Sequence, residues 1–400
     1  MAESMRSNNI RQKGLVDASR CLTYDMDLSE VSEQEHPDVE GAVPGKQPKT
    51  VYVKVVFLKL GEIETVKEQF VADVFIQARW REQVLDSCKS EKVDFNKYWN
   101  PNIQIQNLTS STKRNKWNEI RFGKSGEAFI VERRRISGTF TEKMELEDFP
   151  FDSQDLSILM TSDLPVKEVI LEEDNQDLST INVASFADEQ EWFLSDHVES
   201  NKSVIRKEFT QSKNVEFPVL RVSCIATRQF MFFVWNIIII TFIISTLSFA
   251  TFSVDRTLPQ NRLQLAFTLT LTGVTFRFVA NQSLPKISYL TKLDKYILFC
   301  MIFNFLVSVW HAGGSQIDDG TAADGQHDFW AFIFFIILYS SFQLLFFLTV
   351  LIRYLVARQK IEMKMKAYQE KAVLVLGQKW SSNRRVKSDR NSNRINPTQF

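Results

Sequence analysis

The stretch FMFFVWNIIIITFIISTLSFATF (residues 230–252) decides the fold class, because none of its 23 residues carries a formal charge. A helix needs about 20 apolar residues to cross a bilayer. Residues 329–352 form a second uncharged run, and residues 296–312 form a third, shorter one. A buried core helix is an alternative for the shortest run. The two long runs predict helices that span a membrane.

The segment between the first and third runs, residues 263–284, is amphipathic. Steps of four and three residues place six side chains on one helical stripe: Gln264, Thr268, Leu271, Thr275, Phe278 and Gln282. Polar groups at the ends of the stripe need water or protein around them. Several such helices around an axis would form a pore whose apolar middle gates by dewetting. The alternative is an ordinary helix contact stabilised by threonine hydroxyls.

The first half of the chain has a different pattern. Residues 50–225 alternate apolar and polar side chains in short runs, which predicts an antiparallel β-sandwich. Residues 1–48 are polar and contain three prolines, which predicts a disordered arm. The predicted domains are the arm at 1–48, the sandwich at 49–227, a pore domain at 228–357 and a basic tail at 358–400. We expect helices at about 229–253, 262–284, 294–312 and 329–357, with a short cytoplasmic loop at 313–328.

Composition and motifs argue against several other classes of protein. The chain has 48 basic and 48 acidic residues, so its net charge gives no case for nucleic acid binding. Its four cysteines form no CxxC pair and have no histidine at metal-ligand spacing, so we expect no metal or cofactor. The sequence also offers no nucleophile–base pair or phosphate loop that would support an enzyme.

Several motifs carry a resemblance to a known family. They are Phe149-Pro150-Phe151-Asp152-Ser153-Gln154, Trp99-Asn100-Pro101-Asn102-Ile103 ending at Asn107, and Leu284-Pro285-Lys286-Ile287-Ser288-Tyr289. In this order, beside four membrane segments, they resemble the pentameric ligand-gated ion channels of the Cys-loop receptor superfamily. The resemblance implies an extracellular immunoglobulin-like antiparallel β-sandwich, a four-helix transmembrane bundle and a homopentamer around a central pore. It also implies a multi-pass protein of the plasma membrane.

Departures from the family pattern have structural consequences. Glu142 and Leu156 occupy the positions of the two bracketing cysteines, so the loop disulfide is absent, as in bacterial and divergent invertebrate members. Ile240 replaces the proline usual in the first transmembrane helix, which predicts a straighter helix. The short loop at 313–328 implies that the large cytoplasmic domain of animal synaptic receptors is missing.

The family's working parts can be assigned by position. Agonist binding between neighbouring sandwiches would open the pore through a set of coupling residues. These are Lys67, Glu68, Gln69, Phe149, Pro150, Phe151, Asp152, Arg228, Pro285 and Tyr289. The alternative for each of them is a role in local turn structure. We expect a charge-assisted contact between Asp152 and Arg228. Leu271 would be the central gate, Phe278 a second gate and Gln264 a polar ring.

The ion and the agonist are predicted from side-chain chemistry. The selectivity region, Gln260, Asn261 and Arg262, carries no acidic ring, which favours anions or weak selectivity. Arg277 either adds positive charge to the pore or faces a neighbouring helix. Candidate ligand-binding residues form an incomplete aromatic cage with polar neighbours: Phe75, Gln77, Arg79, Gln106, Asp163, Phe209 and Phe217. They favour a polar or zwitterionic small molecule, or no ligand, over a quaternary amine. The alternative is that Arg79 and the Arg133-Arg134-Arg135 run form solvated strand faces.

Two features leave alternatives open. The tail is basic, and basic flanks usually stay cytoplasmic, whereas the family topology would place it outside. Residues 360–376 are predicted either as an interfacial helix on membrane lipid or as an extension of the last span. The second candidate function is a non-conducting modulatory subunit of a hetero-pentamer.

Overall fold

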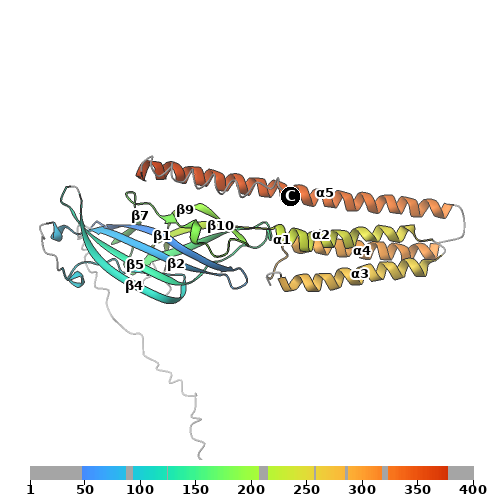
Figure 1. Ribbon diagram of the computed structural model, residues 1–400, viewed down its shortest axis with the longest axis horizontal. Helices are drawn as coiled ribbons and strands as arrows, with labels where there is room; N and C mark the ends of the chain where they lie inside the picture. Colours follow the sequence, from blue (N-terminus) through green and yellow to red (C-terminus); the bar gives the residue numbers. More distant parts are fainter. Residues whose placement is uncertain are drawn as a thin grey trace, which may run out of the picture. The chain divides into compact units, whose positions relative to one another are not determined.

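The computed structural model describes residues 47–86, 93–123, 125–206, 215–255, 258–283, 287–317 and 323–376. Strands occupy the first part of the chain and helices the second (Figure 1). The predicted arm at 1–48 lies almost wholly outside the described residues. The two classes of secondary structure confirm the predicted sandwich and helical bundle.

In the part of the chain that the structure describes, ten strands form two sheets. The six-stranded sheet runs β4-β5-β2-β1-β7, with β8 also paired to β1, and the four-stranded sheet runs β3-β6-β10-β9. Their bounds are β1 Lys49–Glu64, β2 Gln69–Arg81, β3 Ile103–Ile105, β4 Leu108–Phe122, β5 Ala128–Thr141, β6 Ser153–Ser162, β7 Val169–Glu173, β8 Thr180–Ile181, β9 Trp192–Ile205 and β10 Phe217–Arg228. Short 3₁₀ turns lie at Gln83–Leu85, Phe95–Lys97, Val183–Ser185 and Asn281–Ser283. Most pairs are antiparallel, but β1 pairs in parallel with β7 and β8.

Period-two alternation explains the core between the sheets. In β1, Val51, Val53, Val55 and Phe57 are fully buried, while the residues between them are partly exposed. Successive side chains of a strand point to opposite faces, so one face of β1 fills the core. The same alternation in the sequence predicted this arrangement.

The first transmembrane segment is not the regular helix that the absence of proline predicted. It begins as α1 Met231–Phe233, passes through a π-helical segment at Val234–Ile238, continues as α2 Ile239–Thr246 and ends as 3₁₀ helix at Leu247–Ser253. Proline is only one cause of irregularity, since hydroxyl groups that bond to backbone carbonyls also bend helices. Here the hydroxyls of Ser245 and Ser248 donate to the carbonyls of Thr241 and Ser245.

Three longer helices complete the bundle: α3 Pro259–Ala280, α4 Lys292–Ile317 and α5 Ala323–Leu376. Together with residues 231–253, they provide four segments long and apolar enough to cross a membrane. Both α4 and α5 continue into the predicted loop at 313–328, because a helix can extend past the bilayer into water, where polar residues are tolerated. Asp328 at the start of α5 accepts a hydrogen bond from Arg262 of α3.

Helix α5 continues well past its predicted end at residue 357. Residues 358–376 prolong it without interruption, so the predicted tail is helical as far as Leu376. Of the two alternatives for this segment, the structure has the extension of the last span. Lys364, Tyr368 and Lys371 contact the sandwich, which places this part of α5 on the same side of the membrane as the strands.

Glu142 occupies the position of a loop cysteine in the family that the sequence resembles, and it holds the loop by polar contacts. Its buried carboxylate accepts hydrogen bonds from the backbone and hydroxyl of Ser157 in β6 and pairs with Arg221 of β10. Its backbone N–H donates to the carbonyl of Glu68 in the β1–β2 turn. Burial raises the pKa of the Glu142 carboxyl, although Ser157 and Arg221 oppose this shift. A polar cluster therefore occupies the place of the covalent link.

We expect Glu142→Ala to lower the free energy of unfolding by about 1–3 kcal/mol, because buried donors of Ser157 lose their acceptor. Thermal unfolding of the purified protein in detergent measures this loss. Glu145→Ala is the matched control, since Glu145 lies in the same loop and is exposed. Equal melting temperatures of the two variants would contradict the role given to Glu142.

The raised pKa of Glu142 predicts a dependence of stability on pH. The folded state binds this proton more tightly than the unfolded state does, so the stabilising contribution is complete below the ordinary pKa of 4.5. It is lost as the pH rises through the folded pKa. We expect Glu142→Gln, which cannot titrate, to show a smaller fall in melting temperature between pH 4.5 and 7 than the unmodified chain. Parallel profiles would argue against this assignment.

Candidate functional site

A buried ion pair lies at the base of the sandwich, where β10 ends just before the first membrane segment begins at Met231. Arg228 Nε donates to Asp152 Oδ1 at 2.8 Å, and the Arg228 backbone N–H donates to the Asp152 carbonyl at 3.1 Å. The two residues are only 6% and 3% exposed. The guanidinium also lies 4.1 Å from the ring centroid of Trp192 and 4.8 Å from that of Phe149. The predicted charge-assisted contact is confirmed.

The loop at residues 142–152 packs on the helices through its aromatic side chains. Phe149 contacts Phe233 with ring centroids 4.8 Å apart, and Phe151 contacts Phe230 at 4.9 Å. The peptide bond from Phe149 to Pro150 is cis. Asp148 in this loop forms ion pairs with Lys292 of α4 and Arg353 of α5. The loop therefore contacts three of the four membrane segments.

Other residues assigned to coupling have simpler surroundings. Tyr289 accepts a hydrogen bond at its hydroxyl from the Leu146 backbone, 3.0 Å away, which joins the start of α4 to the loop. Lys67 pairs with Glu64 inside the β1–β2 turn, Glu68 has a positive φ of 53°, and Gln69 begins β2. Pro285 lies outside the described residues. The turn is tied to the loop through the Glu68 carbonyl, which accepts the Glu142 N–H.

The predicted pore stripe lies on the face of α3 that the rest of the subunit leaves uncovered. Leu271 and Phe278 are 67% and 70% exposed, and Gln264, Thr268, Thr275 and Gln282 are also exposed. The opposite face carries the buried residues Arg262, Ala266 and Ala280. An apolar face of this size on one subunit requires a covering partner or lipid.

Two basic residues of α3 face the subunit interior. Arg262 is buried, pairs with Asp328 at 2.9 Å and donates to the carbonyls of Val254 and Phe252. Its charge is therefore paired away from the stripe, and its assignment to the selectivity region stays a prediction. Gln260 and Asn261 are exposed. Arg277 contacts Met301 of α4, so it faces a neighbouring helix.

The predicted ligand-binding residues divide between the two sheets. Phe75, Gln77 and Arg79 lie on the same face of β2. Phe75 packs against Trp117 with centroids 6.0 Å apart, and Gln77 accepts a hydrogen bond from Arg133. Arg79 forms two hydrogen bonds to Asp174 and one to Gln176, so its charge is already satisfied within the subunit.

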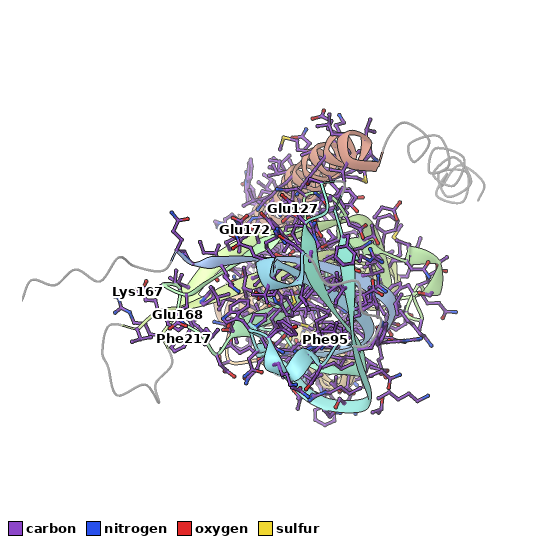
Figure 2. All side chains as sticks on the ribbon, turned by 90° about the vertical axis from the view of Figure 1, so that its left-hand side faces the viewer. Phe95, Glu127, Lys167, Glu168, Glu172 and Phe217 are labelled. Carbon is purple, nitrogen blue, oxygen red and sulfur yellow. The ribbon has the colours of Figure 1, made fainter. Side chains whose placement is uncertain are left out.

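The remaining ligand-binding candidates lie in or beside the four-stranded sheet. Asp163 accepts hydrogen bonds from the amides of Asn102 and Gln104, Gln106 is exposed, and Phe217 is buried at the start of β10. Figure 2 shows Phe217 at one edge of the sandwich, near Lys167 and Glu168. Phe209 lies outside the described residues. The described members of the two groups therefore lie on or beside different sheets.

Sequence reasoning missed the neighbours of the β2 candidates. Trp117 of β4 and Arg133 of β5 lie in register with one another and with Gln77, and Arg133 also pairs with Glu119 at 2.8 Å. Arg133 of the Arg133-Arg134-Arg135 run is thus paired and partly buried. The alternation of Trp117, Glu119 and Arg121 was the available signal, but the strand register that aligns them is a tertiary property.

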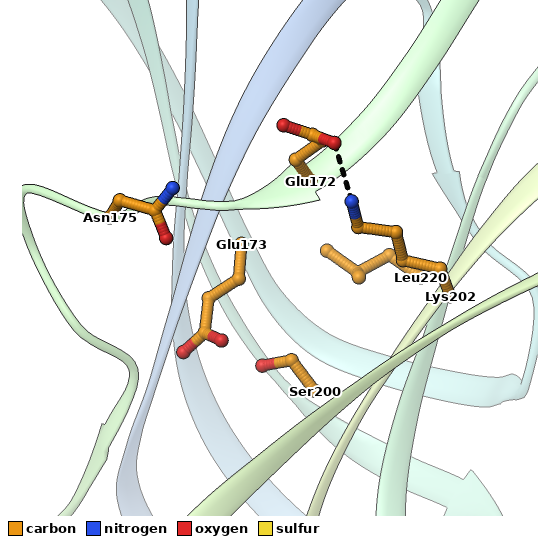
Figure 3. A pocket seen from close by; sticks show the side chains of 6 residues that line it. All are labelled: Glu172, Glu173, Asn175, Ser200, Lys202 and Leu220. Carbon is orange, nitrogen blue, oxygen red and sulfur yellow. Dashed lines mark hydrogen bonds and ion pairs between the residues drawn. The ribbon is translucent and has the colours of Figure 1, made fainter. Parts of the chain in front are cut away.

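A small pocket lies apart from these candidates. It has a volume of about 150 Å³ and is lined by Glu172, Glu173, Asn175, Ser200, Lys202 and Leu220, from β7, β9, β10 and the turn after β7 (Figure 3). Glu172 and Lys202 form an ion pair across it. Its polar lining excludes a purely apolar ligand.

Comparisons with known proteins agree with this architecture. Residues 31–222 match the model of the neurotransmitter-gated ion-channel ligand binding domain, and residues 237–312 match that of the neurotransmitter-gated ion-channel transmembrane region. The two matched regions correspond to the sandwich and to the first three membrane segments.

Similar curated proteins include the gamma-aminobutyric acid receptor subunit gamma-3 of Homo sapiens, 22% identical over 71% of this chain and 60% of that protein. The gamma-aminobutyric acid receptor subunit beta of Lymnaea stagnalis is 21% identical over 67% of this chain and 56% of that protein. The chain thus spans somewhat over half the length of these relatives. Since both family models match in the order of the fold, the chain belongs to the neurotransmitter-gated ion-channel family, a family of membrane receptors and not of enzymes.

Proposed function

We propose that the chain is a subunit of a ligand-gated channel in which five copies surround a pore lined by α3. The observation that carries this proposal is the uncovered stripe of α3, whose polar ends and apolar middle suit a water-filled axis with a hydrophobic gate. Lipid alone would accept Leu271 and Phe278 but not the exposed Gln264 and Gln282.

The agonist site lies, in this proposal, where the β2 face of one sandwich meets the Asp163 side of the next. Phe75 and Trp117 supply apolar contact, while Gln77, Arg133 and Asp163 supply hydrogen bonds and both signs of charge. Such a lining suits a zwitterion, so gamma-aminobutyric acid, named in the relatives, is the first compound to test. The residues directly before Arg262, Gln260 and Asn261, are not acidic, which favours anions as the permeant ions.

A non-conducting modulatory subunit is the second candidate. It is favoured by the internal pairing of Arg79 with Asp174 and of Asp163 with Asn102 and Gln104, which leaves few free polar groups for an agonist. The two candidates differ in whether the chain conducts when it is expressed alone.

Voltage-clamp recording of the singly expressed chain tests the proposal. The screen applies gamma-aminobutyric acid, other amino acids, amines and pH steps, and replaces chloride to obtain the reversal potential. An evoked current establishes a homomeric channel. A surface-expressed chain that is silent alone but alters the currents of a co-expressed channel would support the modulatory role instead.

Leu271 should form the main barrier to ions. We expect Leu271→Ala to raise the resting current at least tenfold, because a wider and less apolar constriction is more easily hydrated. Leu265→Ala is the matched control, since Leu265 is exposed on the same helix but lies off the stripe. Equal resting currents in the two variants, at equal surface expression, would refute the gate assignment.

The Asp152–Arg228 pair should be required for coupling and assembly. Removing one partner leaves a buried charge uncompensated, which costs about 3–5 kcal/mol. We expect Asp152→Ala to lower the thermal stability strongly and to abolish evoked current. The exposed Asp155 provides the control Asp155→Ala. A stable Asp152→Ala channel with unchanged responses would show that the pair is dispensable.

A further inference from the structure

The part of α5 beyond the membrane, residues 358–376, lies against the sandwich; we refer to it as the C-terminal extension. Lys364 Nζ lies 2.8 Å from a carboxylate oxygen of Glu199 in β9, and Lys371 Nζ lies 2.5 Å from Glu173 in β7. Tyr368 donates a hydrogen bond to the Ser179 carbonyl at 2.7 Å and belongs to the sandwich core. The extension is therefore docked through a buried ring as well as through charges.

One face of the extension makes all these contacts. Lys364, Tyr368, Lys371 and Ala372 follow a spacing of four, three and one, which places them on one side of a helix. Tyr368 and Ala372 are buried, whereas Lys366 and Leu374 on the other side are exposed. The docking face thus differs in burial from the rest of the extension.

The extension bridges the two sheets of the sandwich. Glu199 belongs to the four-stranded sheet and Glu173 to the six-stranded sheet. Glu173 also lines the pocket with Ser200 and Lys202, so Lys371 reaches the pocket edge (Figure 3). Lys364 and Lys371 thus pair with acidic side chains from both sheets.

The same helix contacts the junction and the bundle. Arg353 pairs with Asp148 at 3.0 Å, and Tyr354 packs on Phe230 with centroids 5.8 Å apart. Nearer the N-terminal end of α5, the hydroxyl of Tyr339 lies 2.8 Å from the hydroxyl of Ser245 in α2. A single uninterrupted helix therefore connects β9 and β7 with the membrane segments.

We propose that the C-terminal extension is a second link between the sandwich and the pore, with Glu199, Lys364 and Tyr368 as positioning residues for gating. The proposal rests on the proposed channel function. β9 pairs along most of its length with β10, and β10 ends at Arg228, so a displacement of β9 is shared with the start of the first membrane segment. A contact that favours one arrangement of sandwich and helices biases the equilibrium between arrangements.

Docking is tested on the full chain in lipid nanodiscs by hydrogen exchange of residues 361–375. We expect Glu199→Lys and Lys364→Glu each to speed the exchange of these amides at least tenfold, because like charges then face one another. The exchanged pair, Glu199→Lys with Lys364→Glu, should return to within twofold of the unmodified chain. Lys366→Glu makes the same charge change on the undocked face and should have no effect. Unchanged exchange in both single variants would overturn the docking.

Gating is tested with the same substitutions added to Leu271→Ala, whose resting current needs no agonist. We expect each single charge reversal to change this current at least threefold, and the exchanged pair to restore it. An extension that is released without any change in current, relative to Lys366→Glu, would make the contact purely structural and overturn the proposal. If Leu271→Ala reaches the surface but carries no current, the proposed channel function fails, while the exchange experiment still decides the docking.

Discussion

The ion pair of Asp152 and Arg228 is the constraint on which the junction between sandwich and bundle depends. Burying two charges carries a desolvation cost that only good geometry and further hydrogen bonds can offset. Here Arg228 makes a charge-assisted hydrogen bond and a backbone hydrogen bond to Asp152. The aromatic rings of Trp192 and Phe149 lie beside its guanidinium. Because β10 ends at Arg228 and α1 begins at Met231, this geometry fixes the position at which the chain enters the membrane.

Helix α3 has one face that the rest of the chain covers and one face that it leaves exposed. α3 turns its one buried arginine, Arg262, toward Asp328 and turns the stripe from Gln264 to Gln282 outward. Such a helix is poorly suited to lipid on all sides, because lipid offers no partner to the exposed amide of Gln264. The sequence pattern and the observed burial therefore point to the same arrangement, in which the subunit is completed by copies or relatives of itself.

Patterns that repeat along the chain were predictable from the sequence, and contacts between distant residues were not. Alternation in β1 predicted the sandwich, and three uncharged runs together with the amphipathic segment 263–284 predicted the four spans. The FPFD motif led to the contact of Asp152 with Arg228. The π-helical segment at Val234–Ile238 depends on local hydrogen bonding that no period reveals. The pairing of Glu142 with Arg221, 79 residues away, depends on the register of β10 with β6. The burial of Tyr368 likewise requires β8 and β9 to be in place.

The absence of the loop disulfide has a mechanical consequence. A covalent bridge restricts the loop at residues 142–152 in every conformation, whereas here separate contacts to Ser157, Arg221, Lys292 and Arg353 hold it. Pairs that are partly exposed, such as Arg353 with Asp148, each contribute no more than about 1 kcal/mol. In the proposed channel, these pairs can exchange one at a time, while the buried ring of Phe149 stays packed on the helices. Aromatic packing therefore keeps this loop in position, whereas its ion pairs can change partners. Both properties are needed where a sandwich must move a set of helices.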